Sequence, residues 1–195
     1  MEDEFLTISE QTIGEGYYTE KRSKFLAYAH HVGTVEEAKT LADMYRKRYF
    51  DARHVCWAYM IGTDRTLFRV NDDGEPSGTA GKPILGQINS NNLTNIFIAV
   101  IRYFGGVKLG TSGLIAAYRT AAADAIAHAT VQVRLVEEQI TYTFTYPMLN
   151  DVMRVIKELQ PRILSQSFDN TCQMTLSIRQ SLAHQLRQRL DTLSF

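Results

Sequence analysis

The sequence predicts an α+β protein with two domains, an N-terminal domain over residues 1–133 and a C-terminal domain over residues 134–195. The first two thirds of the chain alternate strand and helix patterns, whereas the last third reads strand, helix, strand, strand, helix. A length of 195 residues suits one large or two small domains. The content of 45% hydrophobic and 22% charged residues is typical of a folded chain.

In the N-terminal part, apolar, aromatic and helix-capping patterns predict a regular order of elements. Strands are expected over residues 5–8, 24–32, 53–61, 66–70 and 95–104. Helices are expected over residues 34–49, within residues 75–92, and from Thr111 or Ser112 to residue 128. Thr34 and Glu37 have the spacing of a capping box. Strand 95–104 is nearly all apolar, which predicts a central strand that is buried on both faces.

The last third of the chain predicts a separate ferredoxin-like module, β-α-β-β-α, without a final strand. Apolar and aromatic residues alternate with threonines in a half-buried strand that contains Ile140, Tyr142, Phe144 and Tyr146. A helix over residues 149–159, a hairpin of strands 163–168 and 172–178, and a helix over residues 182–193 follow. The outward face of the sheet shows threonine rather than aromatic residues, which argues against base stacking by this module.

Composition also bounds the function. The chain has 21 Lys and Arg against 21 Asp and Glu, whereas general nucleic-acid binders are usually clearly basic. An acidic N-terminus and the lack of a long apolar stretch predict a cytoplasmic protein without a membrane segment. Because no secretion signal is visible, Cys56 and Cys172 are expected to be reduced core thiols rather than a disulfide.

Between Glu75 and Asp124 the sequence contains no acidic residue, although basic residues and two glycine-rich turns, 78–81 and 105–113, lie there. Glycine lets backbone N–H groups approach a ligand, and a helix that begins after the turn adds its positive end. Cations without competing carboxylates favour an anionic partner. The predicted site for an anion or an acidic partner comprises Glu75, Lys82, Arg102, Lys108, Gly110, Thr111, Ser112, Gly113 and Arg119.

The second glycine-rich turn has two interpretations. It is not a nucleotide P-loop, because Gly110 rather than a lysine precedes Thr111. The turn is either an anion cradle, with Lys108 adding charge, or a tight connection that is needed only for packing.

Glu75 has two interpretations as well. It is a candidate general base, or it pairs with Arg102 or Lys82, and pairing is favoured because structural ion-pair networks are common. Arg102 lies in an apolar strand, and a buried arginine needs a carboxylate such as Glu75 or Asp73.

His54 and Cys56 lie two residues apart on one strand face, a spacing that suits metal ligands or a catalytic pair. The sequence shows neither a second ligand pair for a tetrahedral metal site nor a third group that would orient a nucleophile. We therefore predict no catalytic residue, no metal and no cofactor.

Two long segments resemble the signature of the IMPACT family, in particular of its bacterial YigZ-type members. They are Asp72-Asp-Gly-Glu-Pro-Ser-Gly-Thr-Ala-Gly-Lys-Pro83 and Val100-Ile-Arg-Tyr-Phe-Gly-Gly-Val-Lys-Leu-Gly-Thr-Ser-Gly-Leu114. The strand Arg53-His-Val-Cys-Trp-Ala58 also matches, and the resemblance covers essentially the whole chain. Ser112 stands where a glycine is frequent, which is a departure from the pattern.

The resemblance implies an N-terminal α/β sandwich like the second domain of ribosomal protein S-five, and a C-terminal domain similar to the last domain of elongation factor G. In eukaryotic relatives the N-terminal domain takes part in controlling translation initiation by competing for the activator of a stress kinase. Bacteria lack that kinase pathway, so this role does not transfer intact.

Three functions remain open at the level of the sequence. The leading hypothesis is a translation-linked regulatory binding protein that engages the ribosome, RNA or an acidic protein surface. The competing hypothesis is an enzyme that acts on a small phosphorylated or carboxylated substrate. The third is a scaffold whose signature preserves only the fold. The sequence does not reveal the oligomeric state.

Overall fold

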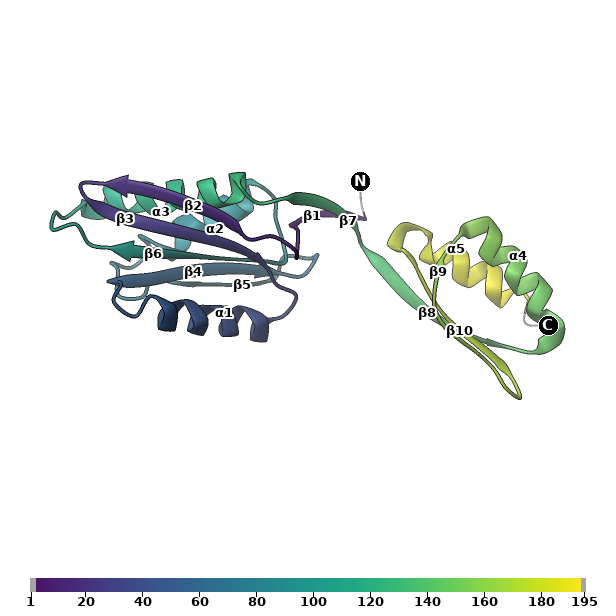
Figure 1. Cartoon of the computed structure of the whole chain (residues 1–195). Helices are drawn as coiled ribbons and strands as arrows, with labels where there is room; N and C mark the ends of the chain where they lie inside the picture. The colour runs from purple at the N-terminus through teal and green to yellow at the C-terminus, as the bar shows by residue number, and fades with distance from the viewer. Residues whose placement is uncertain (1–2, 194–195) are drawn as a thin grey trace. The chain divides into compact units, whose positions relative to one another are not determined.

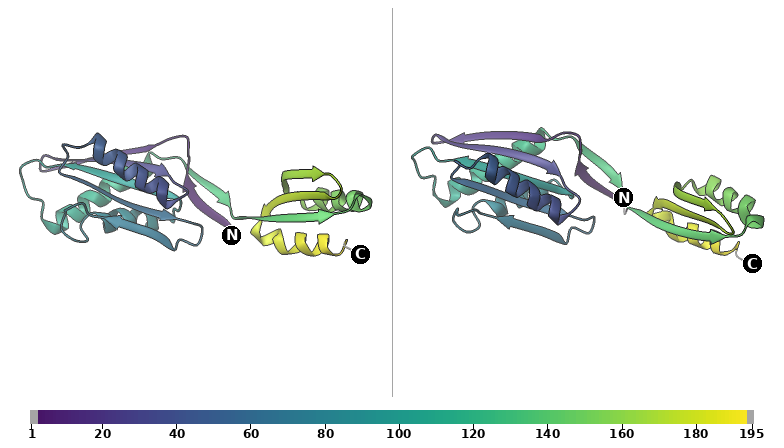
Figure 2. Two further views of the ribbon diagram at one scale, coloured as in Figure 1. Left: turned by 90° about the horizontal axis from the view of Figure 1, so that it is seen from below. Right: turned by 60° about the horizontal axis from the view of Figure 1, so that its bottom comes forward.

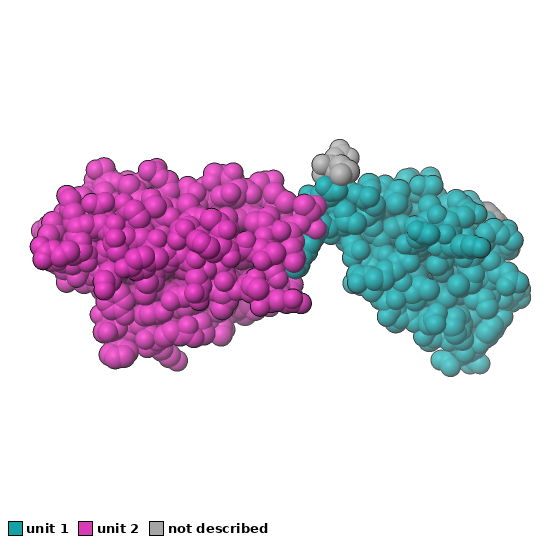
Figure 3. All heavy atoms as spheres, turned by 45° about the horizontal axis from the view of Figure 1, so that its top comes forward, with its two compact units in different colours: residues 1–4, 134–195 teal, residues 5–133 magenta. Residues whose placement is uncertain are grey.

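The computed structural model describes residues 3–193 (Figure 1). Two compact units are present (Figure 3): one comprises residues 5–133, and the other comprises residues 134–193 together with Asp3 and Glu4. The α+β class is confirmed, with an α/β sandwich in the first unit and a ferredoxin-like module in the second. Within residues 3–193, no helix combines the length and apolar character needed to cross a bilayer.

A five-stranded antiparallel sheet with the strand order β2-β3-β6-β4-β5 forms the centre of the first unit. Its strands are β2 (Gly14–Glu20), β3 (Ser23–His31), β4 (His54–Ile61), β5 (Leu67–Asn71) and β6 (Ile96–Tyr103). β6 lies in the middle and is buried from Ile96 to Arg102. The prediction of a central strand here is confirmed, because its apolar residues pack on both faces of the sheet.

Three helices cover this sheet (Figures 1 and 2): α1 (Val35–Arg48) lies on one face, and α2 (Gly81–Ser90) and α3 (Gly110–Ala127) lie on the other. Each face has its own apolar core. Thr34 caps α1 by accepting a hydrogen bond from the N–H of Glu37 at 3.2 Å, as its sequence predicts. The Glu37 carboxylate accepts in turn from the N–H of Gly33 at 2.8 Å.

The structure corrects one local prediction and adds one strand that was not predicted. α3 begins at Gly110, and neither Thr111 nor Ser112 caps it; Leu109 is the N-cap, without a side-chain hydrogen bond. β2 was not expected, because its glycines weaken a strand pattern. The structure requires Gly16 there, since a Cβ at this position would lie 2.4 Å from the backbone nitrogen of Ala125 in α3.

A two-stranded sheet joins β1 (Glu4–Ile8) to β7 (Val131–Leu135). The sequence predicts β1 but not β7, whose five residues alternate without a buried side chain. Short strands of this kind depend on their partner rather than on their own pattern.

The second unit has a three-stranded antiparallel sheet in the order β8-β10-β9, with two helices packed on it. Its elements are β8 (Glu137–Phe144), the 3-10 turn η1 (Tyr146–Met148), α4 (Leu149–Leu159), β9 (Arg162–Phe168), β10 (Cys172–Arg179) and α5 (Gln180–Asp191). Ile140, Tyr142 and Phe144 are buried as expected, but Tyr146 is 49% exposed. The alternation stops there because β8 ends at Phe144 and Tyr146 begins η1.

Candidate functional site

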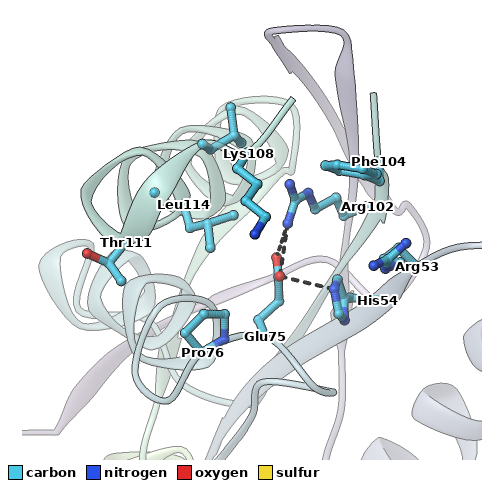
Figure 4. Close-up of a pocket in the computed structure, with 11 residues that line it drawn as sticks. Arg53, His54, Glu75, Pro76, Arg102, Phe104, Lys108, Thr111 and Leu114 are labelled. Atoms are coloured by element: carbon cyan, nitrogen blue, oxygen red, sulfur yellow. Dashed lines mark hydrogen bonds and ion pairs between the residues drawn. The ribbon is translucent and has the colours of Figure 1, made fainter. Parts of the chain in front are cut away.

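A cavity of about 330 Å³ lies in the first unit, beside the start of α3, the segment after β5 and neighbouring ends of β4 and β6 (Figure 4). Of the nine residues in the site predicted from the sequence, five line this cavity: Glu75, Arg102, Lys108, Gly110 and Thr111. The remaining lining residues are Arg53, His54, Pro76, Phe104, Leu109 and Leu114.

Glu75 forms the inner wall of the cavity together with Arg102. Their side chains are only 3% and 6% exposed, and Arg102 Nη1 lies 2.9 Å from each carboxylate oxygen. His54 Nε2 lies 3.0 Å from Oε1, and the Tyr118 hydroxyl donates to Oε2 at 2.6 Å. A carboxylate accepts about four hydrogen bonds, so these contacts occupy its full capacity. The pairing interpretation of Glu75 therefore describes this structure, and its general-base interpretation has no free lone pair to use.

The register of the sheet explains why these side chains meet. β4 and β6 are antiparallel neighbours, and His54 pairs directly with Arg102. Paired residues on adjacent strands project to the same face of a sheet. Both side chains therefore point to the side on which α3 and the segment after β5 pack (Figure 4).

The segment after β5 is held by two consecutive aspartates. The Asp72 carboxylate accepts from the N–H groups of Gly78, Ala80 and Gly81 at 3.0, 3.2 and 2.8 Å. Asp73 accepts from the N–H of Val55 at 2.7 Å. These bonds correct the expectation that both glycine-rich turns offer N–H groups to a ligand, because Asp72 already occupies those of the first turn.

Both ring nitrogens of His54 face acceptors. Nδ1 lies 2.6 Å from the Asp73 carbonyl oxygen and Nε2 lies 3.0 Å from Glu75. A carbonyl and a carboxylate both accept hydrogen bonds, so either ring nitrogen of His54 finds an acceptor when it carries a proton. The pairing of His54 with Cys56 that its sequence spacing suggested is absent. Cys56 Sγ instead lies 3.1 Å from the Asp72 carbonyl oxygen.

Cys56 is not arranged as a nucleophile. Its side chain is buried, and burial raises the pKa of its thiol well above the usual range. A buried thiol with a raised pKa is a structural group rather than a reactive one. Among residues 3–193, no cluster of three or more His, Cys, Asp or Glu side chains is suited to a metal ion.

Positive charge dominates the rest of the cavity. Arg53 and Lys108 are exposed at its rim, and the α3 N-terminus contributes Gly110 and Thr111. Gly110 has a φ of 73°, a left-handed conformation that glycine adopts without strain. Because no side chain within the described residues caps α3, the N–H groups of its first turn add partial positive charge.

Arg102 carries an unmet hydrogen-bonding requirement. Its Nε is buried and has no partner within the described part of the chain, although Nη1 binds Glu75. A buried donor without an acceptor costs about 1–3 kcal/mol, so this nitrogen is an exception among the buried polar groups of the unit. The guanidinium also lies 5.5 Å from the centre of the Phe104 ring, and that of Arg53 lies 5.2 Å from the same ring.

The other predicted residues, Lys82, Ser112, Gly113 and Arg119, do not line this cavity. Conversely, the site prediction omitted Arg53, His54 and Phe104. All three were visible in the segments 53–58 and 100–114 that resemble the family, but only the pairing of β4 with β6 sets His54 beside Arg102 at the cavity.

Comparisons with known proteins agree with this architecture. The family model described as the Impact N-terminal domain matches residues 21–126. An IMPACT family member of Haemophilus influenzae is 34% identical over 160 residues, which are 81% of this chain and 78% of the relative. The IMPACT family member YigZ of Escherichia coli is 33% identical over 150 residues, 76% of this chain and 74% of the relative.

Solved structures extend the likeness to both units. A crystal structure described as that of a hypothetical protein aligns with 98% of this chain and 93% of its own, with 27% identity and a TM-score of 0.73. The two-domain translational regulator Yih1 aligns with 63% of this chain and 49% of its own, at 24% identity and a TM-score of 0.41. The family model covers more than half of the chain, so the chain belongs to the IMPACT family.

Proposed function

We propose that this chain is a translation-linked regulatory binding protein whose first unit engages an anionic partner. The observation that carries the proposal is the cavity beside α3, where Arg53, Lys108 and the helix N-terminus meet. The carboxylate that lines this cavity, Glu75, is fully engaged by its neighbours. A cation-lined recess without a free carboxylate favours an anion.

The link to translation comes from the family. The family's signature segments surround the cavity: residues 72–83 supply Glu75 and Pro76, and residues 100–114 supply Arg102, Lys108 and Gly110. In eukaryotic relatives the corresponding domain takes part in translation control, as the resemblance implies. For this chain we propose ribosomes, RNA or an acidic protein of the cytoplasmic translation machinery as the partner.

The competing proposal is an enzyme that acts on a small phosphorylated or carboxylated substrate. The recess favours it, since about 330 Å³ is within the range of small-molecule pockets. The contacts of the inner wall oppose it, because Glu75 and His54 have no position left for a substrate proton. General acid–base catalysis needs such a group within hydrogen-bond reach of the reacting atom.

Capture of partners from a native lysate at low and high salt tests the binding proposal. An electrostatic complex should lose ribosomes, RNA or the acidic protein steeply as salt rises. Lys108→Glu reverses charge at the exposed rim and should abolish capture. Lys47→Glu makes the same change on the exposed surface of α1, away from the cavity, and should leave capture intact.

Two results contradict the proposal. One is capture by the Lys108→Glu protein equal to that of the unchanged protein. The other is a complete lack of partners at low salt, which would favour the scaffold hypothesis. Turnover of a small phosphorylated compound that depends on Glu75 would favour the enzyme.

A further inference from the structure

A second cavity, of about 570 Å³, adjoins the first at Phe104. It is lined by Tyr17, Arg22, Lys24, Leu26, Tyr103 and Phe104, a set that contains two cations, three aromatic rings and no carboxylate. The two cavities therefore share one aromatic side chain, and cations lie on both sides of it.

Sheet register explains this composition. Tyr17 pairs with Leu26, and Lys24 pairs with Tyr103, so four side chains of the second cavity share one face of the sheet. α1 packs on this face mainly over β4 and β6 and makes few contacts with β2. The part of this face that lies near β2 is consequently not covered by the helix. Tyr17 and Phe104 are 51% and 40% exposed.

A third cavity of the first unit differs from the second, because its lining includes acidic residues as well as basic ones. It lies between α1 and β4 and has a volume of about 320 Å³. There Asp43 and Asp73 accompany the basic residues Lys39, Arg46 and Arg69. Asp73 also pairs with Arg46 at 3.0 Å, so charge in this third cavity is compensated internally.

Exposed aromatic rings interleaved with cations are typical of surfaces that bind single-stranded nucleic acid, because bases stack on the rings and cations follow the backbone. An acidic peptide would use the cations but not the rings. The buried Glu75 and Arg102 side chains form the inner wall of the first cavity, whereas the exposed Arg53 and Lys108 lie at its rim. This arrangement suits a chain end rather than an internal phosphodiester.

We propose that single-stranded RNA binds here, with a terminal phosphate in the first cavity and the adjacent base stacked on Phe104. This inference rests on the proposed function and specifies its partner. Lys108, Arg53 and the α3 N–H groups would hold the phosphate. The Glu75 charge is offset by the Arg102 guanidinium at 2.9 Å and does not oppose the phosphate.

The test uses the full chain and a roughly eight-nucleotide oligouridylate, a length within the range of one single-strand-binding domain. One oligomer carries a 5′-phosphate, one a 3′-phosphate and one only hydroxyl ends, each with a fluorophore on an unphosphorylated end. Fluorescence anisotropy should show at least about tenfold tighter binding of one phosphorylated oligomer, as expected for hydrogen bonds to a charged group. Uridine monophosphate and inorganic phosphate serve as competitors that contain the phosphate without the chain.

Variants assign the two parts of the site. Lys108→Ala should remove the preference for the phosphorylated end. Phe104→Ala should weaken binding of every oligomer by about 5- to 150-fold, the range expected for loss of one stacked base. Lys47→Ala, in which the basic side chain lies outside both cavities, should match the unchanged protein. Tryptophan fluorescence and circular dichroism establish that each variant is folded.

Equal affinity for the phosphorylated and hydroxyl oligomers would overturn the inference, as would a Phe104→Ala protein that binds normally. Competition by uridine monophosphate as effective as that by the phosphorylated oligomer would show a small-molecule site and would also overturn it. If salt-sensitive capture of ribosomes or an acidic protein persists while the oligomers fail, the broader binding proposal survives and only this inference falls.

Discussion

Replacing Glu75 by glutamine is expected to destabilise the first unit strongly. The change keeps the shape of the side chain but removes the charge that offsets Arg102. Glutamine also brings an NH₂ group to a position where the guanidinium, the imidazole ring and the Tyr118 hydroxyl all require an acceptor.

The size of the effect follows from burial. The Glu75 and Arg102 side chains are 3% and 6% exposed, so water cannot replace the lost partner. Breaking a buried ion pair by removing one member costs about 3–5 kcal/mol, because a buried charge is left uncompensated. That is a large fraction of the roughly 5–15 kcal/mol by which domains are stable.

Urea unfolding followed by tryptophan fluorescence measures this change in the first unit alone. Trp57 is the only tryptophan of the chain and lies in β4, the strand that also carries His54. Free energies are compared from the midpoint and slope of each transition. Glu15→Gln, at an exposed position of β2, is the matched control and should change the free energy of unfolding by less than about 0.5 kcal/mol.

The reasoning would be refuted by a Glu75→Gln protein as stable as the Glu15→Gln control. A double variant that adds Arg102→Met sharpens the result. Because it leaves no unpaired carboxylate or guanidinium, it should lose less stability than the sum of the two single variants. Strict additivity would mean that the two side chains are not coupled in solution.

Three further predictions concern the stability of the first unit, followed by the same fluorescence assay. Gly16→Ala should lower the free energy of unfolding by about 1–3 kcal/mol or more, because the added methyl group clashes with Ala125. Gly86→Ala, inside α2 with open space around it, should raise this free energy by about 0.5–1 kcal/mol. Equal effects of the two changes would contradict the packing argument. Thr34→Ala should cost about 1 kcal/mol by removing the α1 cap, and an unchanged midpoint would contradict this role. Burial lowers the pKa of His30 to about 4 from 6.5, so between these pH values the unfolded chain binds the proton more readily than the folded chain. The free energy of unfolding should therefore fall as the pH drops from about 6.5 to about 4, and it should fall less in a His30→Gln variant. An equal fall in both proteins would exclude His30 as the cause.

Patterns that depend on near neighbours in the chain were readable from the sequence. The apolar run that became β6, the Thr34 cap and the alternation through Ile140 to Phe144 all report local preferences for burial or hydrogen bonding. The acid-free window after Glu75 contains Lys108 and Gly110, which line the cavity. Strand β2 could not be predicted from the sequence, because its glycines are required by close packing against α3, which only the folded structure shows.

Tertiary structure alone decided which charged groups remain available to a partner. The sequence left Arg102 either as a cation for an anionic partner or as the partner of a carboxylate such as Glu75 or Asp73. Strand pairing sets it beside His54, and chain folding places Glu75 within 2.9 Å of it. Asp72 similarly accepts hydrogen bonds from the N–H groups of the first glycine-rich turn. At the second turn, no side chain of the described residues caps the N-terminus of α3. A charge is cancelled by whatever lies a few ångströms away in space, and groups far apart in a chain become neighbours only when the sheet forms its register.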